Sequence, residues 1–202
     1  MHPNPAFRPA PAPSPEQVLG FATAIGFAHI FAATADGPMV VHAPVTRHGS
    51  ALRFHVARAN RIAPHLDGAD VLVSVAGDQG YISPNWYAGP GDQVPTWNYV
   101  AAEIDGRAEA VAQAALVEQL DMLAQVHEQR VIPENPWTSA KTDPAIFARM
   151  LGAIRGFEIV PTATRSTIKL SQNKSPADRD GVIEGLRRAG EIGLADAMAA
   201  RA

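Results

Sequence analysis

Four strand-like segments follow one another with short connections in the first half of the chain. They are HIFAAT (29–34), MVVHAPV (39–45), ALRFHVA (51–57) and ADVLVSVAG (69–77). Asp36-Gly37, a favoured hairpin dipeptide, joins the first two. Strands joined by such short turns pair antiparallel, because a parallel crossover needs about a dozen residues or more. This spacing excludes a parallel nucleotide-binding sheet.

Two more strands and several helices follow from the remaining pattern. The stretch 97–111 predicts a long strand in which Asp105-Gly106 is either a turn or a bulge, and FEIVPTATRSTIKL (157–170) predicts another. Helices are expected after Ser14-Pro15, over 113–129, after Thr142-Asp143-Pro144, after Ser175-Pro176 and in the tail beyond Gly190. The expected fold is mainly antiparallel β with flanking helices, arranged as a compact barrel.

Proline punctuation and helix signals divide the chain into three parts. Residues 1–15 form a proline-rich N-terminal arm of extended character. Residues 16–175 contain the barrel with its inserted helices, and 176–202 form a C-terminal helical segment.

Composition removes several function classes. The 202 residues include no cysteine, which excludes disulfides and thiolate chemistry, and the seven histidines show no clustered ligand spacing, so we expect no metal site. The formal net charge of -3 gives no general attraction to nucleic acid or an anionic membrane. With no secretory leader and no apolar run near the roughly 20 residues that span a bilayer, we expect a cytoplasmic protein.

The aromatic residues are concentrated in YISPNWYAGPGDQVPTWNY (81–99), which holds all three tyrosines and two of the three tryptophans. Flat rings on a proline-punctuated loop suit a planar ligand, with Ser83, Asn85, Thr96 and Asn98 as hydrogen-bonding neighbours. An aromatic core beneath a long loop and a dimer interface are equally compatible with this segment.

Two polar segments are the other candidates for a binding site. RFHVARANR (53–61) ends a strand with two arginines, a histidine and an asparagine, a set that suits phosphate, although a solvated strand end is an equal alternative. KLSQNK (169–174) lies between a strand and a capped helix, and its ordinary interpretation is a polar loop. His29, His42 and His55 lie in consecutive strands and could converge across a sheet.

Taken together, these segments resemble the FMN-binding negative transcriptional regulators, also called PaiB-like proteins. The matching pieces are NPAFR (4–8), HAPV (42–45), FHVARAN (54–60), YISPNWY (81–87), VPTWNY (94–99), Gly106-Arg107, ENPW (134–137) and GFEI…KLSQNK (156–174). They occur in the family's order over nearly the whole chain. HAPV departs from the family's bulkier HLPF-like version, which changes packing more than chemistry.

The resemblance implies a six-stranded FMN-binding split β-barrel, spanning 16–175 here, that forms homodimers with flavin sites at the subunit interface. The strand with His55, Arg58 and Asn60 should meet the FMN phosphate, and the aromatic and KLSQN segments should line the ring and ribityl chain. The implied FMN-binding residues are His42, His55, Arg58, Asn60, Ser83, Trp86, Thr96, Trp97, Asn98, Lys169, Gln172 and Asn173.

The resemblance also implies a role as a transcriptional repressor, although the charge of the chain does not support direct DNA binding. The alternative is a flavin-dependent oxidoreductase of the split-barrel type: a flavin reductase, an oxidase or a haem-degrading protein. No side chain demands a catalytic role, and His55 and Tyr87 are the first candidates for proton transfer. A barrel that has lost flavin and keeps only the dimer is a third hypothesis.

Overall fold

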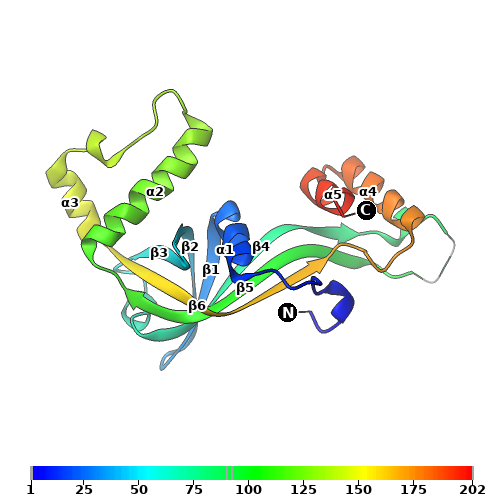
Figure 1. Cartoon of the computed structure of the whole chain (residues 1–202), viewed down its shortest axis with the longest axis horizontal. Coiled ribbons are helices and arrows are strands. Elements are labelled where there is room, and N and C mark those ends of the chain that lie inside the picture. The colour runs from blue at the N-terminus through cyan, green and yellow to red at the C-terminus, as the bar shows by residue number, and fades with distance from the viewer. Residues whose placement is uncertain (1, 90, 92, 202) are drawn as a thin grey trace. The chain divides into compact units, whose positions relative to one another are not determined.

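Six strands close into a barrel in the computed structural model, which describes residues 2–201 except 90 and 92 (Figure 1). The strands are β1 (Phe27–Thr34), β2 (Gly37–His48), β3 (Ala51–Ala57), β4 (Ala69–Ile82), β5 (Thr96–Ala110) and β6 (Ile154–Lys169). Their order around the barrel is β1-β2-β3-β6-β5-β4. β1 pairs antiparallel with β2 and β4, and β3 pairs antiparallel with β2 and β6. The predicted barrel with flanking helices is confirmed.

Three helices begin directly after the capping residues expected from the sequence, Ser14, Asp143 and Ser175. The helices are α1 (Pro15–Ile25), α2 (Gln113–Val131), α3 (Pro144–Gly152), α4 (Pro176–Ala189) and α5 (Ile192–Ala199). Asp143 Oδ1 accepts the backbone N–H of Ala145 at the start of α3, and Ser175 Oγ accepts that of Asp178 at the start of α4. Gly190 ends α4 with a left-handed φ of 85°.

One local prediction differs from the structure. The first hairpin turns at Ala35-Asp36, not at Asp36-Gly37, because Gly37 already pairs with Thr34 and begins β2. Of the two alternatives for Asp105-Gly106, the turn is excluded because β5 continues through it, and the bulge stays a prediction. A Cβ on Gly106 would lie 2.7 Å from the Val160 carbonyl oxygen, so the glycine permits close contact with β6.

The described chain divides into two compact units, each with its own core. The barrel unit comprises 15–75 and 103–164 and contains α1, α2, α3 and most of the strand residues. Alternate side chains of β3 point inward, and Phe54 stacks on Phe157 of β6 with ring centroids 5.4 Å apart. The three-part division predicted from the sequence stays a prediction.

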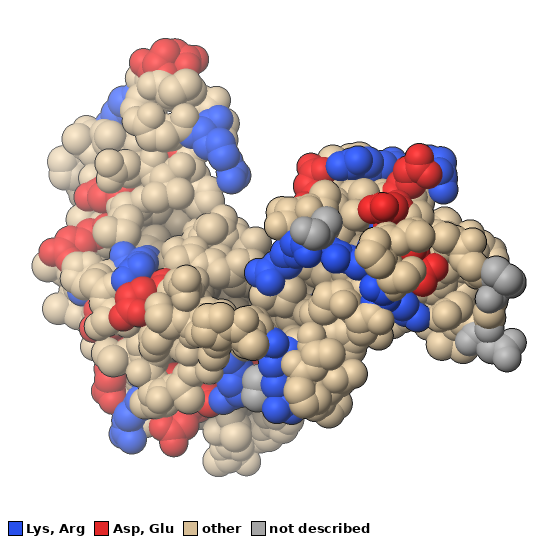
Figure 2. Space-filling view, turned by 45° about the vertical axis from the view of Figure 1, so that its right-hand side comes forward, with Lys and Arg blue, Asp and Glu red and all other residues tan. Residues whose placement is uncertain are grey.

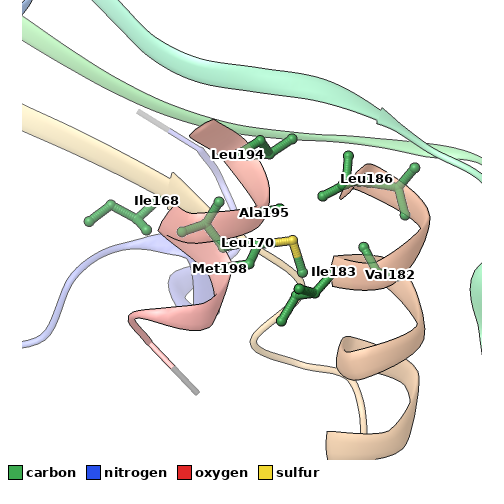
Figure 3. Packing of buried hydrophobic residues seen from close by; sticks show 9 residues of the cluster. Ile168, Leu170, Val182, Ile183, Leu186, Leu194, Ala195 and Met198 are labelled. Carbon is green, nitrogen blue, oxygen red and sulfur yellow. The ribbon is translucent and has the colours of Figure 1, made fainter. Parts of the chain in front are cut away.

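The second unit, which we call the helical unit, comprises 1–14, 76–102 and 165–202. Its core lies where α4 and α5 pack on the ends of β4 and β6 (Figure 3). The buried cluster consists of Ile82, Ile168, Leu170, Val182, Ile183, Leu186, Leu194, Ala195 and Met198. The proline-rich arm packs within this unit, because Phe7 is buried and the His2 backbone N–H donates to Thr167 Oγ1 over 3.1 Å.

Candidate functional site

The residues predicted to bind FMN are distributed over both units, which are described in turn. The barrel unit holds His42, His55, Arg58 and Asn60. The helical unit holds Ser83, Trp86, Thr96, Trp97, Asn98, Lys169, Gln172 and Asn173. Within each unit some of these side chains face a surface, and others are engaged internally.

Arg58 and Asn60 organise the turn after β3. Arg58 Nε donates to the Gly152 carbonyl and the Arg58 backbone N–H donates to the Ala153 carbonyl, each over 2.8 Å. These carbonyls end α3, where the helix dipole favours a cation. Asn60 Oδ1 accepts the Ile62 backbone N–H over 3.2 Å. Both residues therefore stabilise local structure, and their contact with phosphate stays a prediction.

His42 lies on the outer face of the barrel. It pairs across the strands with His29, and the two rings meet edge to face with centroids 4.7 Å apart. The residues on either side of His42 in β2 are buried, so the exposed His42 side chain points outward. The next outward pair on these strands is Phe31 and Val40, both exposed. His42 therefore belongs to an exposed surface with apolar neighbours.

Arg53 is a buried charge that the sequence motifs did not single out. Its Nε donates to Glu158 on β6 over 2.6 Å, and its NH1 donates to Glu118 on α2 over 3.0 Å. Burial alone lowers the pKa of Arg53, but the hydrogen bonds and charges of Glu158 and Glu118 raise the pKa above its ordinary value. These contacts fasten α2 to the barrel wall. An arginine amid the apolar residues of ALRFHVA was the signal available in the sequence.

His55 lines an apolar cavity of about 690 Å³ bounded by α2, α3 and the adjoining strands. Its Nδ1 is buried and has no hydrogen-bond partner among the described residues. Gln119, which is 2% exposed, likewise leaves both polar side-chain atoms unpaired within the described part of the chain. Burial lowers the pKa of His55, and its contact with Gln119 acts in the opposite direction. The sequence did not predict this cavity.

We expect acidification to destabilise the protein partly through His55. An unfolded histidine titrates near pH ~6.5, whereas burial lowers the pKa of His55 in the folded chain. The stability contributed by neutral His55 is therefore complete above the unfolded pKa and is lost as the pH falls toward the folded pKa. Urea unfolding between about pH 7.5 and 5.5 should show a larger loss for the parent than for His55→Gln; equal losses would contradict this assignment.

In the helical unit, the side chains of the KLSQN turn stabilise the turn itself. Buried Ser171 has a left-handed φ of 57°, and its Oγ accepts from Asn98 Nδ2 over 2.9 Å. Gln172 Nε2 donates to the carbonyls of Ala6 and Ile168 over 2.9 and 2.5 Å. Gln172 and Asn98 are thus engaged internally. Asn98 Oδ1 is buried and has no hydrogen-bond partner among the described residues.

Three side chains lie on the strand face that points away from α4 and α5: Tyr81, Trp97 and Lys169. Their neighbours Ile82 and Ile168 pack into the core beneath those helices, and Asn98 Nδ2 contacts Met198 of α5. Because successive side chains of a strand alternate between faces, the three residues point the other way. Tyr81 and Trp97 are each 49% exposed. We call these three residues the aromatic face; Tyr81 was not among the predicted site residues.

Lys169 supplies a poorly solvated positive charge to the aromatic face. Its Nζ donates to Thr96 Oγ1 over 2.6 Å and lies 5.6 Å from the centroid of the Phe7 ring. Burial lowers the pKa of Lys169, because removing the ammonium group from water disfavours its charged form. An anionic ligand beside the ammonium group would offset this effect. Asn173 is exposed at the end of the adjoining turn.

Trp86 is partly buried and packs against the core of the helical unit. Its indole lies on Gly185 of α4, where a Cβ would be 2.7 Å from Trp86 Cε2. A Cβ on Gly181 would overlap the Trp86 carbonyl oxygen. The aromatic segment therefore contributes to packing and to the surface, because Trp86 packs against the core while Trp97 is exposed. The roles of both residues toward FMN stay predictions.

Ser83 and Tyr87, which lie on either side of Trp86 in the sequence, both contact other residues of the helical unit. Ser83 Oγ accepts the Asn85 backbone N–H over 3.2 Å and so caps the short 3₁₀ turn Pro84–Trp86. Tyr87 is half-buried, and Lys174 Nζ lies 4.7 Å from the centroid of its ring. Burial, with a further contribution from Asp178, raises the pKa of Tyr87. Tyr87 is therefore a phenol at neutral pH, and its role in proton transfer stays a prediction.

The described residues contain neither a metal-binding cluster nor a helix suited to span a membrane. No group of three or more histidine, aspartate or glutamate side chains there could hold a metal ion. No described helix combines the length and the apolar character needed to cross a membrane.

Comparison of sequences gives a family match and a curated relative. Residues 1–163 match the model of a family described as "Putative FMN-binding domain". The chain is 36% identical over 118 residues to Protease synthase and sporulation protein PAI 2 of Bacillus subtilis (strain 168). That alignment covers 58% of this chain and 55% of the relative, so the chain spans about half the length of the curated relative it matches.

Comparison of structures finds the same fold in distant proteins. The FAD and heme binding protein of Mycobacterium smegmatis superposes with a TM-score of 0.55 at 16% identity, covering 83% of this chain and 77% of that one. The flavocytochrome Anf3 of Azotobacter vinelandii superposes with a TM-score of 0.52 at 18% identity, covering 74% of this chain and 66% of that one. At such identities the likeness concerns the fold, a split barrel.

Proposed function

The chain belongs to the family described as "Putative FMN-binding domain", and from this premise we propose that it is a homodimeric FMN-binding protein of the PaiB-like type. The family match over residues 1–163 is the observation that carries the proposal. The aromatic face of the helical unit supports it, because two exposed rings and the ammonium group of Lys169 belong to one strand face.

The side chains of the aromatic face fit the chemistry of FMN. Trp97 and Tyr81 offer exposed ring faces for a planar heterocycle, and Lys169 offers a charged donor for its oxygen atoms. When bound, FMN supplies one- and two-electron redox chemistry, while the protein orients the ring and excludes water. Asn98 and Gln172 would act indirectly by holding the KLSQN turn in place.

Binding of FMN is the experiment that tests this function. We expect the purified protein to be yellow, or to bind added FMN with a rise in melting temperature. Trp97→Ala and Lys169→Gln should each weaken the FMN affinity by about tenfold or more, because they remove a stacking surface and a charged donor.

Lys141→Gln, a lysine in the barrel unit, is the matched control and should retain the parent affinity. Isothermal titration calorimetry with FMN gives the dissociation constants. A colourless protein whose melting temperature is the same with and without added FMN would refute the proposed function. Unchanged affinity in both variants would leave flavin binding standing but remove the aromatic face from the site.

The outer face of β1 and β2 is our proposed dimer interface. Its outward cross-strand pairs are Phe27 with Pro44, His29 with His42, and Phe31 with Val40. Phe27, Phe31 and Val40 are all exposed, which is unusual for large apolar side chains gathered on one sheet face. His42, a predicted flavin contact, lies in the middle of this surface. A dimer formed here would bring His42 to the subunit interface.

Regulation of transcription is the proposed biological role, exerted through the flavin or a partner protein. The net charge is -3, and basic and acidic atoms are interspersed over α4 and α5 (Figure 2). There Arg187 pairs with Asp196 and Arg188 with Glu184, so these cations are already neutralised. Oxidation of a reduced nicotinamide by the FMN-loaded protein would favour the alternative, a flavin-dependent oxidoreductase.

A further inference from the structure

We propose that the cavity of the barrel unit between α2, α3 and the strands binds a neutral aromatic small molecule with one hydrogen-bonding group. The proposal does not depend on flavin binding, and it assigns His55 to this cavity in place of the FMN phosphate. The proposal rests on the size of the cavity and on the chemistry of its lining, to which the imidazole of His55 belongs.

The cavity has the dimensions of a small-molecule site. Its volume of about 690 Å³ falls within the range of roughly 300 to 1,000 Å³ typical of ligand pockets. Its walls include His55 on β3, Leu123 and His127 on α2, and Phe147 and Met150 on α3. A molecule of two to four fused rings fits this space.

The walls of the cavity are fastened to the barrel at both helices. Arg53 joins β3 to α2 through Glu118, and the guanidinium of Arg58 holds the carbonyl of Gly152 at the end of α3. Asp143 caps the start of α3 by accepting two backbone N–H groups. The cavity is therefore preformed, which lowers the ordering cost that a ligand has to overcome.

The lining selects for a neutral and aromatic ligand. Trp137 and Phe147 present ring surfaces and Met150 presents a thioether, all of which pack well on aromatic molecules. The polar members of the described lining are His55, His127 and Thr142, and no lysine, arginine, aspartate or glutamate belongs to it. A charged ligand would lose its hydration here without gaining a counter-ion.

His55 supplies the polar anchor. Its imidazole is one of three polar side chains in the described lining of the cavity, with those of His127 and Thr142. A ligand hydroxyl or carbonyl that enters this apolar space needs a hydrogen-bond partner, and the imidazole of His55 can provide one. One hydrogen-bonding group on an otherwise apolar ring system meets this requirement.

The first test measures whether the cavity binds such a molecule. Nile red, a neutral fused-ring dye with a carbonyl group, should bind with a rise in fluorescence, and Ala124→Phe should weaken its binding at least about tenfold by filling the cavity. Ala114→Phe, the same change at an exposed position of α2, is the matched control and should bind as the parent does.

The second test identifies the anchor with two probes of nearly equal shape. 2-Naphthol and 2-methylnaphthalene differ in a hydroxyl and a methyl group, and each is used to displace Nile red. The ratio of their affinities should shift against 2-naphthol by about tenfold in His55→Phe, because the variant keeps a ring but loses the hydrogen bond. Circular dichroism spectra and melting temperatures confirm that each variant is folded.

Three outcomes would overturn the proposal. Equal Nile red binding by Ala124→Phe and the parent would place the dye elsewhere. An affinity ratio that does not change in His55→Phe would remove the anchor. Displacement of Nile red by FMN would make the cavity part of the flavin site. A protein that binds Nile red and not FMN would instead refute the proposed flavin function and leave this site intact.

Discussion

Replacing Gly181 with alanine should lower the free energy of unfolding by about 2–3 kcal/mol. The added methyl group would overlap the Trp86 carbonyl oxygen, which is backbone and cannot rotate away. α4 would have to move off the strands, and this movement would disturb the buried cluster around Val182 and Leu186. Alanine otherwise favours a helix over glycine by about 1 kcal/mol, so the clash has to outweigh that gain.

Gly20→Ala provides the matched control for this prediction. Gly20 also lies inside a helix, α1, but nothing is within 4 Å of a Cβ built there. The same substitution should therefore be neutral or stabilise the protein by up to about 1 kcal/mol. Urea unfolding followed by tryptophan fluorescence measures both changes. A Gly181→Ala variant as stable as the parent would show that Trp86 does not hold α4 by this contact.

Phe31→Glu should raise the dissociation constant of the proposed homodimer by about 100-fold or more. A two-fold interface contains the substituted position twice, so two carboxylates would be buried on association without partners. Phe31 is 41% exposed, which means that the free subunit tolerates the charge. Sedimentation velocity over a range of protein concentrations measures the dissociation constant.

Val160→Glu places the same charge at an exposed apolar position of β6 and should leave association unchanged. If the flavin sites lie at the interface, Phe31→Glu should also weaken FMN binding, whereas Val160→Glu should not. A parent protein that sediments as a monomer at all concentrations, or a Phe31→Glu variant that dimerises normally, would refute the β1–β2 interface.

Local chemistry made most of the fold predictable from the sequence. β3 occupies Ala51–Ala57, the range expected from its pattern, and α4 begins after Ser175 as its capping residues require. These features depend on residues a few positions apart. The same holds for antiparallel pairing, since short connections allow no other arrangement. The predicted position of the first hairpin turn was one residue too late in the chain. Gly37 has a left-handed φ, as a turn glycine does, but it already pairs with Thr34 and so belongs to β2.

The candidate site was less predictable, because exposure depends on distant partners. Trp86 and Trp97 have similar surroundings in the sequence, but α4 presents glycines to Trp86 and leaves Trp97 exposed. Gln172 belongs to a motif that resembles a ligand-binding turn, yet its amide holds the carbonyl of Ala6 in the N-terminal arm. Residue types indicated which groups can bind a flavin, and their roles toward FMN stay predictions.

The sequence by itself determined the class of the protein: an antiparallel barrel with flanking helices, in a family whose model describes FMN binding. Turn lengths and helix caps are visible in the sequence because they depend on residues close together in the chain. The order of the motifs is visible because it matches that of the family. Tertiary structure alone decided which rings are buried, how Arg53 fastens α2 to the barrel, and that a cavity opens beside His55. Packing between segments far apart in the chain creates these features, and no local pattern records it.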